Sequence, residues 1–281
     1  MPFVDGLKTM LDRRGLRCAL LPVVNHLARS RGHGVKKITY EDGVWIHETL
    51  GGYFAYHQPF VRLDMSRMDE LAKTNFLWGY RPEAGDVVMD VGAGVGEEAL
   101  TFSRAVGERG KVVCVEAHPR TYRCLEKLVQ YNRLANVIAI HQAVTEPSCR
   151  MATIEDSREY LSNRVNAAAG ISVPATTIDA IHQQLGLERV HFLKMNIEGA
   201  ERLAIRGMAR TLEQTEVLCV SCHDFLAEEL GDDCLRTKSA VKQFLQRDGF
   251  TIVERFEPGL PPYLRDQVWA YNEQLMKRAA S

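Results

Sequence analysis

Three glycines at alternate positions follow an acidic residue in the stretch 90–96, which reads Asp-Val-Gly-Ala-Gly-Val-Gly. Glycine lets the backbone turn sharply and come close to a ligand. A helical pattern begins directly afterwards, and the free amides at a helix start can face the polar end of a ligand. This combination predicts a cradle for a nucleotide-like cofactor at the first turn of an open α/β sheet.

The acid in front of the glycines indicates which cofactor this is. Dinucleotide enzymes carry the spacing G-x-G-x-x-G, whereas this chain has D-x-G-x-G-x-G. A carboxylate at Asp90 would repel a pyrophosphate but attract a cation. S-adenosylmethionine carries a sulfonium and an ammonium group, so the spacing favours a methyl donor over a dinucleotide. An ordinary strand, turn and helix without a ligand is the remaining alternative.

Further residues are expected to complete the cofactor site. Glu116 ends the next apolar run, 20 residues beyond Gly96, where a carboxylate usually accepts hydrogen bonds from ribose hydroxyls. Asp90 is expected to hold the ammonium group directly or through water, with the amides near Gly92 and Gly94 around the methionine part. Additional cofactor contacts are expected at Ala93 and Ala117, and at the adenine edge from Gln142 and Ala143.

The bulk composition limits the class of protein. A chain of 281 residues with 46% hydrophobic content suits one large α/β domain with an extension, or two small domains. The net charge of −1 gives no general basic field for nucleic acid. Residues 1–37 hold eight Lys or Arg and two Asp, a charge of +6, which leaves −7 for the remainder. This basic segment is expected to be a solvated helix, or else a contact for an anionic membrane or acceptor.

Cysteine usage and hydropathy indicate a reduced, cytoplasmic setting. The seven cysteines are scattered, no secretory signal is evident, and no stretch reaches 18 apolar residues. Cys219 and Cys222 have C-x-x-C spacing, but their apolar, strand-like surroundings predict buried core thiols rather than a redox pair. The sequence leaves the oligomeric state open, homo-oligomers included.

Strand and helix patterns alternate from residue 87 onward and predict a doubly wound, Rossmann-like sheet. Strands are expected at 87–91, 112–116, 137–141, 190–195, 217–222, 251–256 and 267–271, and helices at 96–106, 119–134, 177–187, 200–212 and 239–248. Earlier patterns predict helices over 5–30 and 66–80 and two strands over 39–49 and 53–63. The expected domains are an N-terminal extension, residues 1–79, that helps to cover the acceptor, and a cofactor-binding domain, residues 80–281.

This alternation and the glycine motif resemble class I methyltransferases. A second motif, Phe-Leu-Lys-Met-Asn-Ile-Glu-Gly-Ala-Glu at 192–201, resembles the K-x-D-x-E-G-A-E motif of the FkbM family, and residues 176–179 and 207–208 also fit that family. The resemblance covers residues 80–272. It implies a seven-stranded sheet with an antiparallel last strand, and the methylation of hydroxyl groups on sugars, polyketides or other natural products. One departure is Asn196, where the family usually has Asp.

Methyl transfer to an alcohol needs a base or a metal ion to take up the proton. Open α/β sheets bind ligands at the carboxyl ends of their strands, so we expect the catalytic residues among Lys194, Asn196, Glu198 and His223. His223 is the predicted base because histidine titrates in the right range. Asn196 removes one oxygen ligand for a hard cation, which favours a reaction without an essential metal. A metal site on Glu198, His223 and Asp224 is the alternative.

The sequence therefore predicts an S-adenosylmethionine-dependent O-methyltransferase with a sugar, glycan or other small-molecule acceptor. A nucleic-acid methyltransferase is disfavoured because no aromatic residue follows Asn196 to hold a flipped base. A non-catalytic module that keeps the cofactor fold is a further alternative. The polar stretch Thr145–Ser172 is about 28 residues long, far above ordinary loop lengths, and is predicted to cover the acceptor together with the N-terminal segment.

Overall fold

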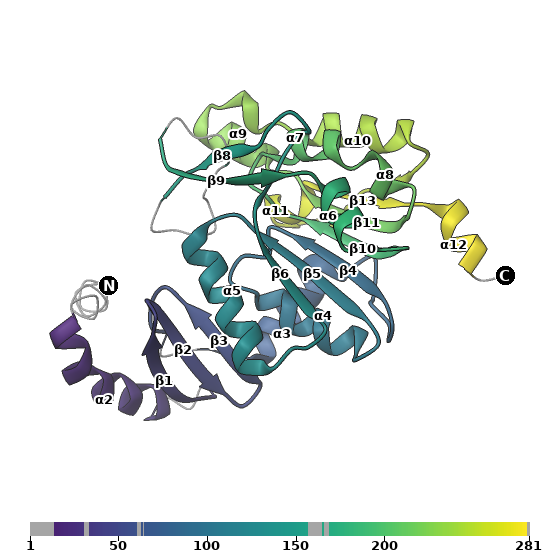
Figure 1. The fold of residues 1–281 in the computed structure, drawn as a ribbon. Coiled ribbons are helices and arrows are strands. Elements are labelled where there is room, and N and C mark those ends of the chain that lie inside the picture. Colours follow the sequence, from purple (N-terminus) through teal and green to yellow (C-terminus); the bar gives the residue numbers. More distant parts are fainter. Residues whose placement is uncertain are drawn as a thin grey trace.

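The computed structural model describes residues 14–30, 34–60, 63, 65–156, 165 and 169–279. Within these residues a seven-stranded sheet forms the centre, and helices cover both of its faces (Figure 1). Its strand order is β12-β13-β11-β10-β4-β5-β6. The strands are β4 (Val87–Val91), β5 (Lys111–Glu116), β6 (Val137–His141), β10 (Val190–Met195), β11 (Thr215–Ser221), β12 (Thr251–Val253) and β13 (Gln267–Tyr271).

Strand directions confirm the predicted fold class. Strands β6, β5, β4, β10 and β11 run parallel to one another, whereas β13 runs antiparallel to both β11 and β12. The last strand of the chain is thus the antiparallel one, as the family resemblance implies, and it lies one place inside the edge of the sheet. The predicted strands 87–91, 137–141, 190–195 and 267–271 have the observed bounds.

The sheet is buried on both faces, because successive side chains of a strand point to opposite sides. On one face Val88 and Phe192 pack with helices α3, α4 and α5. On the other face Met89 and Leu193 pack with α6, α7, α8 and α10 (Figure 1). The helices are α3 (Met65–Phe76), α4 (Glu97–Val106), α5 (Pro119–Asn132), α6 (Ile178–Gln184), α7 (Glu201–Ala204), α8 (Ala209–Leu212) and α10 (Lys238–Arg247).

Two sequence predictions about local structure were wrong. The expected helix 200–212 is divided into α7, a 3-10 turn (Ile205–Gly207) and α8. At the break, a Cβ on Gly207 would lie 2.8 Å from the carbonyl oxygen of Thr145, so the chain packs too closely there for a regular surface helix. The two strands expected at 39–49 and 53–63 are three, because Asp42 and Gly43, both with positive φ, form an additional hairpin turn.

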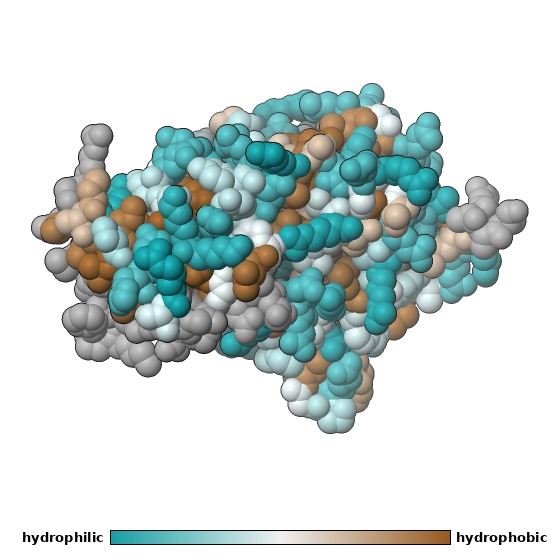
Figure 2. Space-filling model, turned by 90° about the horizontal axis from the view of Figure 1, so that it is seen from below, coloured by the Kyte–Doolittle hydropathy of each residue, from teal (hydrophilic) through white to brown (hydrophobic). Residues whose placement is uncertain are grey.

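The described part of the N-terminal extension packs against the main domain. It consists of helix α2 (Arg14–Ser30), strands β1 (Val35–Glu41), β2 (Val44–Thr49) and β3 (Gly52–Tyr56), and α3. Phe54 shares a hydrophobic core with Leu100 of α4 and Leu128 of α5, so the described part of the extension is packed directly on these helices. The face seen in Figure 2 is largely hydrophilic with scattered apolar residues.

The long stretch 145–172 holds regular structure at both ends. Strands β7 (Ala143–Val144), β9 (Ile171–Thr176) and β8 (Met151–Ile154) form a small sheet in that order. Residues 157–164 and 166–168 lie outside the described residues.

The remaining helices are α9 (Asp224–Leu230), α11 (Pro262–Arg265) and α12 (Glu273–Ala279). Cys219 and Cys222 are fully buried, as predicted. In the described part of the chain, no helix combines the length and apolarity needed to cross a membrane.

Candidate functional site

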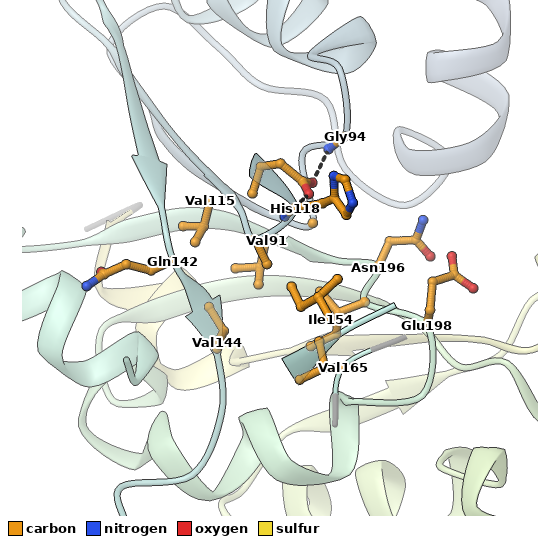
Figure 3. A pocket seen from close by; sticks show the side chains of 14 residues that line it. Val91, Gly94, Val115, His118, Gln142, Val144, Ile154, Val165, Asn196 and Glu198 are labelled. Carbon is orange, nitrogen blue, oxygen red and sulfur yellow. Dashed lines mark hydrogen bonds between the residues drawn. The ribbon is translucent and has the colours of Figure 1, made fainter. Parts of the chain in front are cut away.

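A first cavity lies at the carboxyl ends of β4 and β5 (Figure 3). The turn after β4 and the segment after β5 form its polar side. In Figure 3, Asn196 and Glu198 lie side by side at one end, while Gln142 lies at the opposite end. Its apolar walls are formed by Val91, Val115, Val144, Ile154, Val165 and Ile197. A flat, largely apolar ring system with a polar edge, such as adenine, suits these walls.

Glu116 supplies the fixed carboxylate of this cavity. Its Oε2 accepts a hydrogen bond from the Gly94 amide at 2.9 Å, and its Oε1 accepts one from the His118 amide at 2.8 Å. Burial raises the pKa of Glu116 to about 7, although these two amides oppose the shift. A carboxylate has about four lone-pair directions, so acceptor capacity is left for two hydroxyl groups.

Two positions of the turn, Gly92 and Gly94, require glycine for different physical reasons. A Cβ on Gly92 would lie 1.9 Å from the carbonyl oxygen of Asn196, so the close approach of two backbone segments requires glycine. A Cβ on Gly94 would meet nothing within 4 Å, and its φ is +58°. Gly94 therefore leaves open space beside the Glu116 carboxylate, as a cradle for a bound molecule would.

A second, larger cavity adjoins the first at four shared residues. The two enclose about 660 and 1260 Å³, space open to solvent included. The shared residues are Gly92, Gly94, Asn196 and Glu198. The second cavity has an aromatic side formed by Phe76, Phe225 and Tyr263, and a charged side formed by Glu97, Glu98, Lys194, Glu198 and His223.

The structure places most predicted cofactor residues in these cavities. The first is lined by Gly92, Gly94, Glu116, Ala117 and Gln142, and Ala93 lines the second. Two predicted contacts find no support. Ala143 is fully buried in β7 and lines neither cavity. Asp90 is also fully buried and lines neither, because its carboxylate pairs with Lys194 and not with the open space.

Lys194 fixes the glycine turn through an ion pair with Asp90 and a hydrogen bond to Gly92. Its Nζ lies 2.8 Å from Asp90 Oδ1 and donates a hydrogen bond to the Gly92 carbonyl oxygen at 2.8 Å. Burial alone would lower the pKa of Lys194, but the Asp90 and Glu98 carboxylates outweigh it and raise the pKa. The ammonium is thus held in its charged form and positions the turn between the two cavities.

Sequence reasoning missed His118, which lines the first cavity. It is the N-cap of α5, where its Nδ1 accepts from the Arg120 amide at 3.3 Å. Its Nε2 lies 3.3 Å from Asp156 Oδ1. The signal available in the sequence was its place directly before Pro119, a residue that favours the first position of a helix.

Three side chains form a buried carboxylate–imidazole–carboxylate row beside the second cavity. His223 Nε2 lies 3.4 Å from Glu198 Oε1, and His223 Nδ1 lies 3.3 Å from Glu201 Oε1. Burial works to lower the pKa of His223, but Glu201, Glu198 and Asp266 outweigh it and raise the pKa. Burial also raises the pKa of Glu198, against the pull of His223. The raised pKa of His223 favours its protonated form, and the raised pKa of Glu198 makes its carboxylate a better proton acceptor.

The alternative metal set is not assembled. Asp224 Oδ1 accepts from the amides of Thr237 and Lys238, at 2.8 and 3.0 Å, and so caps α10. It does not line the cavity that contains Glu198 and His223. Within the described residues, no three His, Cys, Asp or Glu side chains converge as metal ligands.

Comparison with known proteins places the chain in a family. The sequence model of the methyltransferase FkbM domain matches residues 90–252, more than half of the chain. Among solved structures, an FkbM methyltransferase from Methylobacillus flagellatus is 17% identical, with a TM-score of 0.49; the match covers 75% of this chain and 51% of that one. The chain thus spans about half the length of that relative. No curated protein matches the chain.

Two other solved structures are similar at a comparable distance. Aeropyrum pernix fibrillarin, in complex with S-adenosyl-L-methionine, is 16% identical with a TM-score of 0.45, over 84% of this chain and 98% of that one. A SAM-dependent methyltransferase from Aquifex aeolicus is 15% identical with a TM-score of 0.42, over 75% and 98%. Likeness at this level says nothing about the acceptor.

The cofactor of the family fits the first cavity. Glu116 offers its lone pairs for ribose hydroxyls, Gly94 leaves room for a bound molecule, and the apolar walls suit adenine. The cofactor is S-adenosylmethionine, and the chain belongs to the FkbM family of methyltransferases.

Proposed function

We propose that this protein methylates a hydroxyl group of a sugar, glycan or other natural product. The observation that carries the proposal is the junction of the two cavities, where Glu198 lines both and lies 3.4 Å from His223. A cofactor in the first cavity and an acceptor in the second would meet at this junction. Holding both reactants in line there would supply much of the catalysis.

The bound cofactor supplies an activated methyl group on its sulfonium. As the acceptor oxygen forms its bond to carbon, the bond from carbon to sulfur breaks and sulfur keeps the electron pair. The hydroxyl proton has to leave the acceptor oxygen in the same process, and a carboxylate at the junction can accept it.

We propose Glu198 as that proton acceptor, with His223 as its partner. Both ring nitrogens of His223 face carboxylates, so the imidazole is stabilised in its protonated form, which cannot accept another proton. Before the reaction, two carboxylates and one protonated imidazole give the row of Glu198, His223 and Glu201 a net charge of −1. After Glu198 has accepted the proton, the row is neutral. This assignment modifies the expectation that His223 itself is the base.

The second cavity suits a polyhydroxylated acceptor with an apolar face. Glu97 and Glu98 can accept hydrogen bonds from hydroxyls, and the aromatic side can cover a ring. Asn75 and Phe76 from the end of α3 line this cavity, which supports an acceptor-covering role for the N-terminal extension.

The predicted acceptor cover by residues 145–172 has less support. Its described residues Ile154 and Val165 line the first cavity and not the second. We therefore propose that this stretch covers the cofactor. Five basic and amide residues of this stretch could contact hydroxyls or an anionic group of an acceptor. Arg150 is exposed and lines neither cavity, whereas Arg158, Asn163, Arg164 and Asn166 lie outside the described residues.

All seven cysteines are free thiols, which supports a reducing, cytoplasmic setting.

The test of the proposed reaction is transfer of isotope-labelled methyl groups from S-adenosylmethionine to a panel of sugars, glycans and phenols. We expect a labelled methyl ether on the acceptor. Cofactor binding without transfer to any hydroxyl compound would favour a non-catalytic module, and labelled RNA or DNA would favour a nucleic-acid methyltransferase.

A further inference from the structure

We infer that Glu201 is a positioning residue, whose buried carboxylate holds the His223 imidazole and the turn that carries Glu198 in a single arrangement. No role was expected for this residue beyond its place in the family motif. The inference rests on the proposed function in that Glu198 is the proton acceptor that Glu201 positions.

The contacts of Glu201 are complete and entirely internal. The residue is 0% exposed at the start of α7. Its Oε1 accepts from the amides of Ile197 and Gly199, at 3.3 and 3.2 Å, and its Oε2 accepts from the Thr237 hydroxyl at 3.1 Å. The same Oε1 lies 3.3 Å from His223 Nδ1. A buried carboxylate with this many donors is costly to remove, and it fixes each donor in place.

The first consequence concerns the backbone of Glu198. Its φ is +50°, a left-handed conformation that a side chain disfavours. The amides on either side of Glu198, those of Ile197 and Gly199, both donate to the one oxygen of Glu201. Such a conformation persists when its surroundings over-determine it. Glu201 therefore aims Glu198 at the junction of the two cavities.

The second consequence concerns the ring of His223. With Nδ1 held against Glu201, Nε2 is left facing Glu198. A histidine whose one nitrogen is held by a carboxylate has a defined orientation and proton position. The charged groups that face His223 are Glu201 from α7, Glu198 from the turn after β10, and Asp266 before β13. Without the Glu201 charge, only the carboxylates of Glu198 and Asp266 would remain to offset burial, which lowers the pKa of His223.

The test is Glu201→Gln in the full chain. Glutamine keeps the hydrogen bonds, because its amide oxygen can accept from Ile197 and Gly199 while its NH₂ donates to the Thr237 hydroxyl. Only the charge beside His223 disappears. NMR titration of the His223 ring, assigned with His223→Gln, is expected to show its pKa lowered by about one unit or more. Turnover is expected to fall about 10- to 100-fold with little change in the acceptor KM.

Two further variants separate positioning from simple stability. Thr237→Val removes one hydrogen bond of Glu201 but keeps its charge, so the pKa of His223 should stay within a few tenths of a unit of wild type. Glu201→Asp keeps the charge on a shorter side chain, farther from the imidazole, so the His223 pKa should lie between those of wild type and Glu201→Gln. If Glu201→Gln fails to fold, a His223 pKa in Glu201→Asp that is no lower than in Thr237→Val would overturn the inference.

An unchanged His223 pKa in Glu201→Gln would overturn the inference, as would an equal shift in Thr237→Val. The titration requires no acceptor. A shifted pKa in a protein that methylates no hydroxyl compound would therefore refute the proposed function while leaving the positioning of His223 by Glu201 intact.

Discussion

The two cavities of this protein meet at shared residues but are built in different ways. The first is apolar, and its fixed carboxylate, Glu116, is held by backbone amides from the turns beside it. It is formed mostly by short segments that each directly follow a strand. The second is lined by side chains from α3, α4, β10, α9 and α11 and by the charged residues Glu198 and His223 next to them, and its two cations, Lys194 and His223, are paired with buried carboxylates.

This difference separates what the family has in common from what an acceptor requires. A cofactor that is the same throughout a family can be bound by backbone amides and a local motif. An acceptor cavity is assembled from distant segments, so its shape changes with any of them. Gly92, which lines both cavities, is a place where a change should affect both functions.

The largest effect should come from Gly92, which lies at the junction of the two cavities. Gly92→Ala would place a Cβ 1.9 Å from the Asn196 carbonyl oxygen, and we expect it to destabilise the fold by about 4 kcal/mol or more. Gly94→Ala meets no atom within 4 Å and should cost only about 1–2 kcal/mol for its left-handed backbone. It should nevertheless weaken S-adenosylmethionine binding. Thermal unfolding and calorimetry measure the two effects, and a Gly92→Ala protein as stable as wild type would refute the close-approach argument.

Loss of the proton acceptor or of its partner should affect turnover rather than cofactor affinity. Glu198→Gln keeps the side-chain volume but loses the proton acceptor, so turnover should fall about 10²–10⁴-fold. His223→Ala should fall within the same range because it removes the partner of Glu198. Calorimetry should show S-adenosylmethionine binding close to that of wild type for both variants. Full activity in Glu198→Gln would remove this residue from the chemistry.

A change in the first cavity should instead weaken binding of the cofactor. Glu116→Ala removes two charge-assisted hydrogen bonds to ribose, each worth about 1.5–3 kcal/mol, so affinity should fall about 100-fold or more. Adenosine is the sharper probe, because it lacks the methionine part and is expected to bind in the first cavity alone. Glu98→Gln is the matched control, since Glu98 lines only the second cavity. Equal adenosine affinity in Glu116→Ala and wild type would contradict the ribose assignment.

The smallest effect is a pH dependence of adenosine affinity. The pKa of Glu116 is about 7, and only the ionised carboxylate offers all of its lone pairs to ribose. Affinity should therefore be full at pH 8 and fall about tenfold at pH 6, as one proton is bound. In Glu116→Ala the dependence should vanish. A flat profile in wild-type protein would show that Glu116 does not titrate in this range.

Much of the fold follows from patterns that are local in the chain. Apolar runs of five or six residues bounded by turns predicted the strands, because a strand covered on both faces needs apolar side chains on both. The glycine turn and Glu116 were predictable because each lies at the carboxyl end of its own strand. The Asp42–Gly43 turn was overlooked despite its typical hairpin sequence.

Pairings between distant side chains were not predictable in this way. The sequence indicated that Asp90 faces the cofactor, but the parallel register of β4 and β10 sets Lys194 directly beside it. Asp224 looked like a ligand next to His223, but it caps α10 instead. In both cases a carboxylate could serve a ligand or a protein group, and the partner lies too far along the chain to be read from spacing.

By itself, the sequence determined the doubly wound sheet, the cofactor class and the edge of the sheet where the candidate site lies. These depend on periodicity and on residues that follow a strand, which the chain order alone specifies. Only the tertiary structure decided which carboxylate meets which cation: Lys194 with Asp90, and His223 between Glu198 and Glu201. The reason is that a buried charge must find an opposite charge or a hydrogen-bond donor, and packing decides which group is within reach.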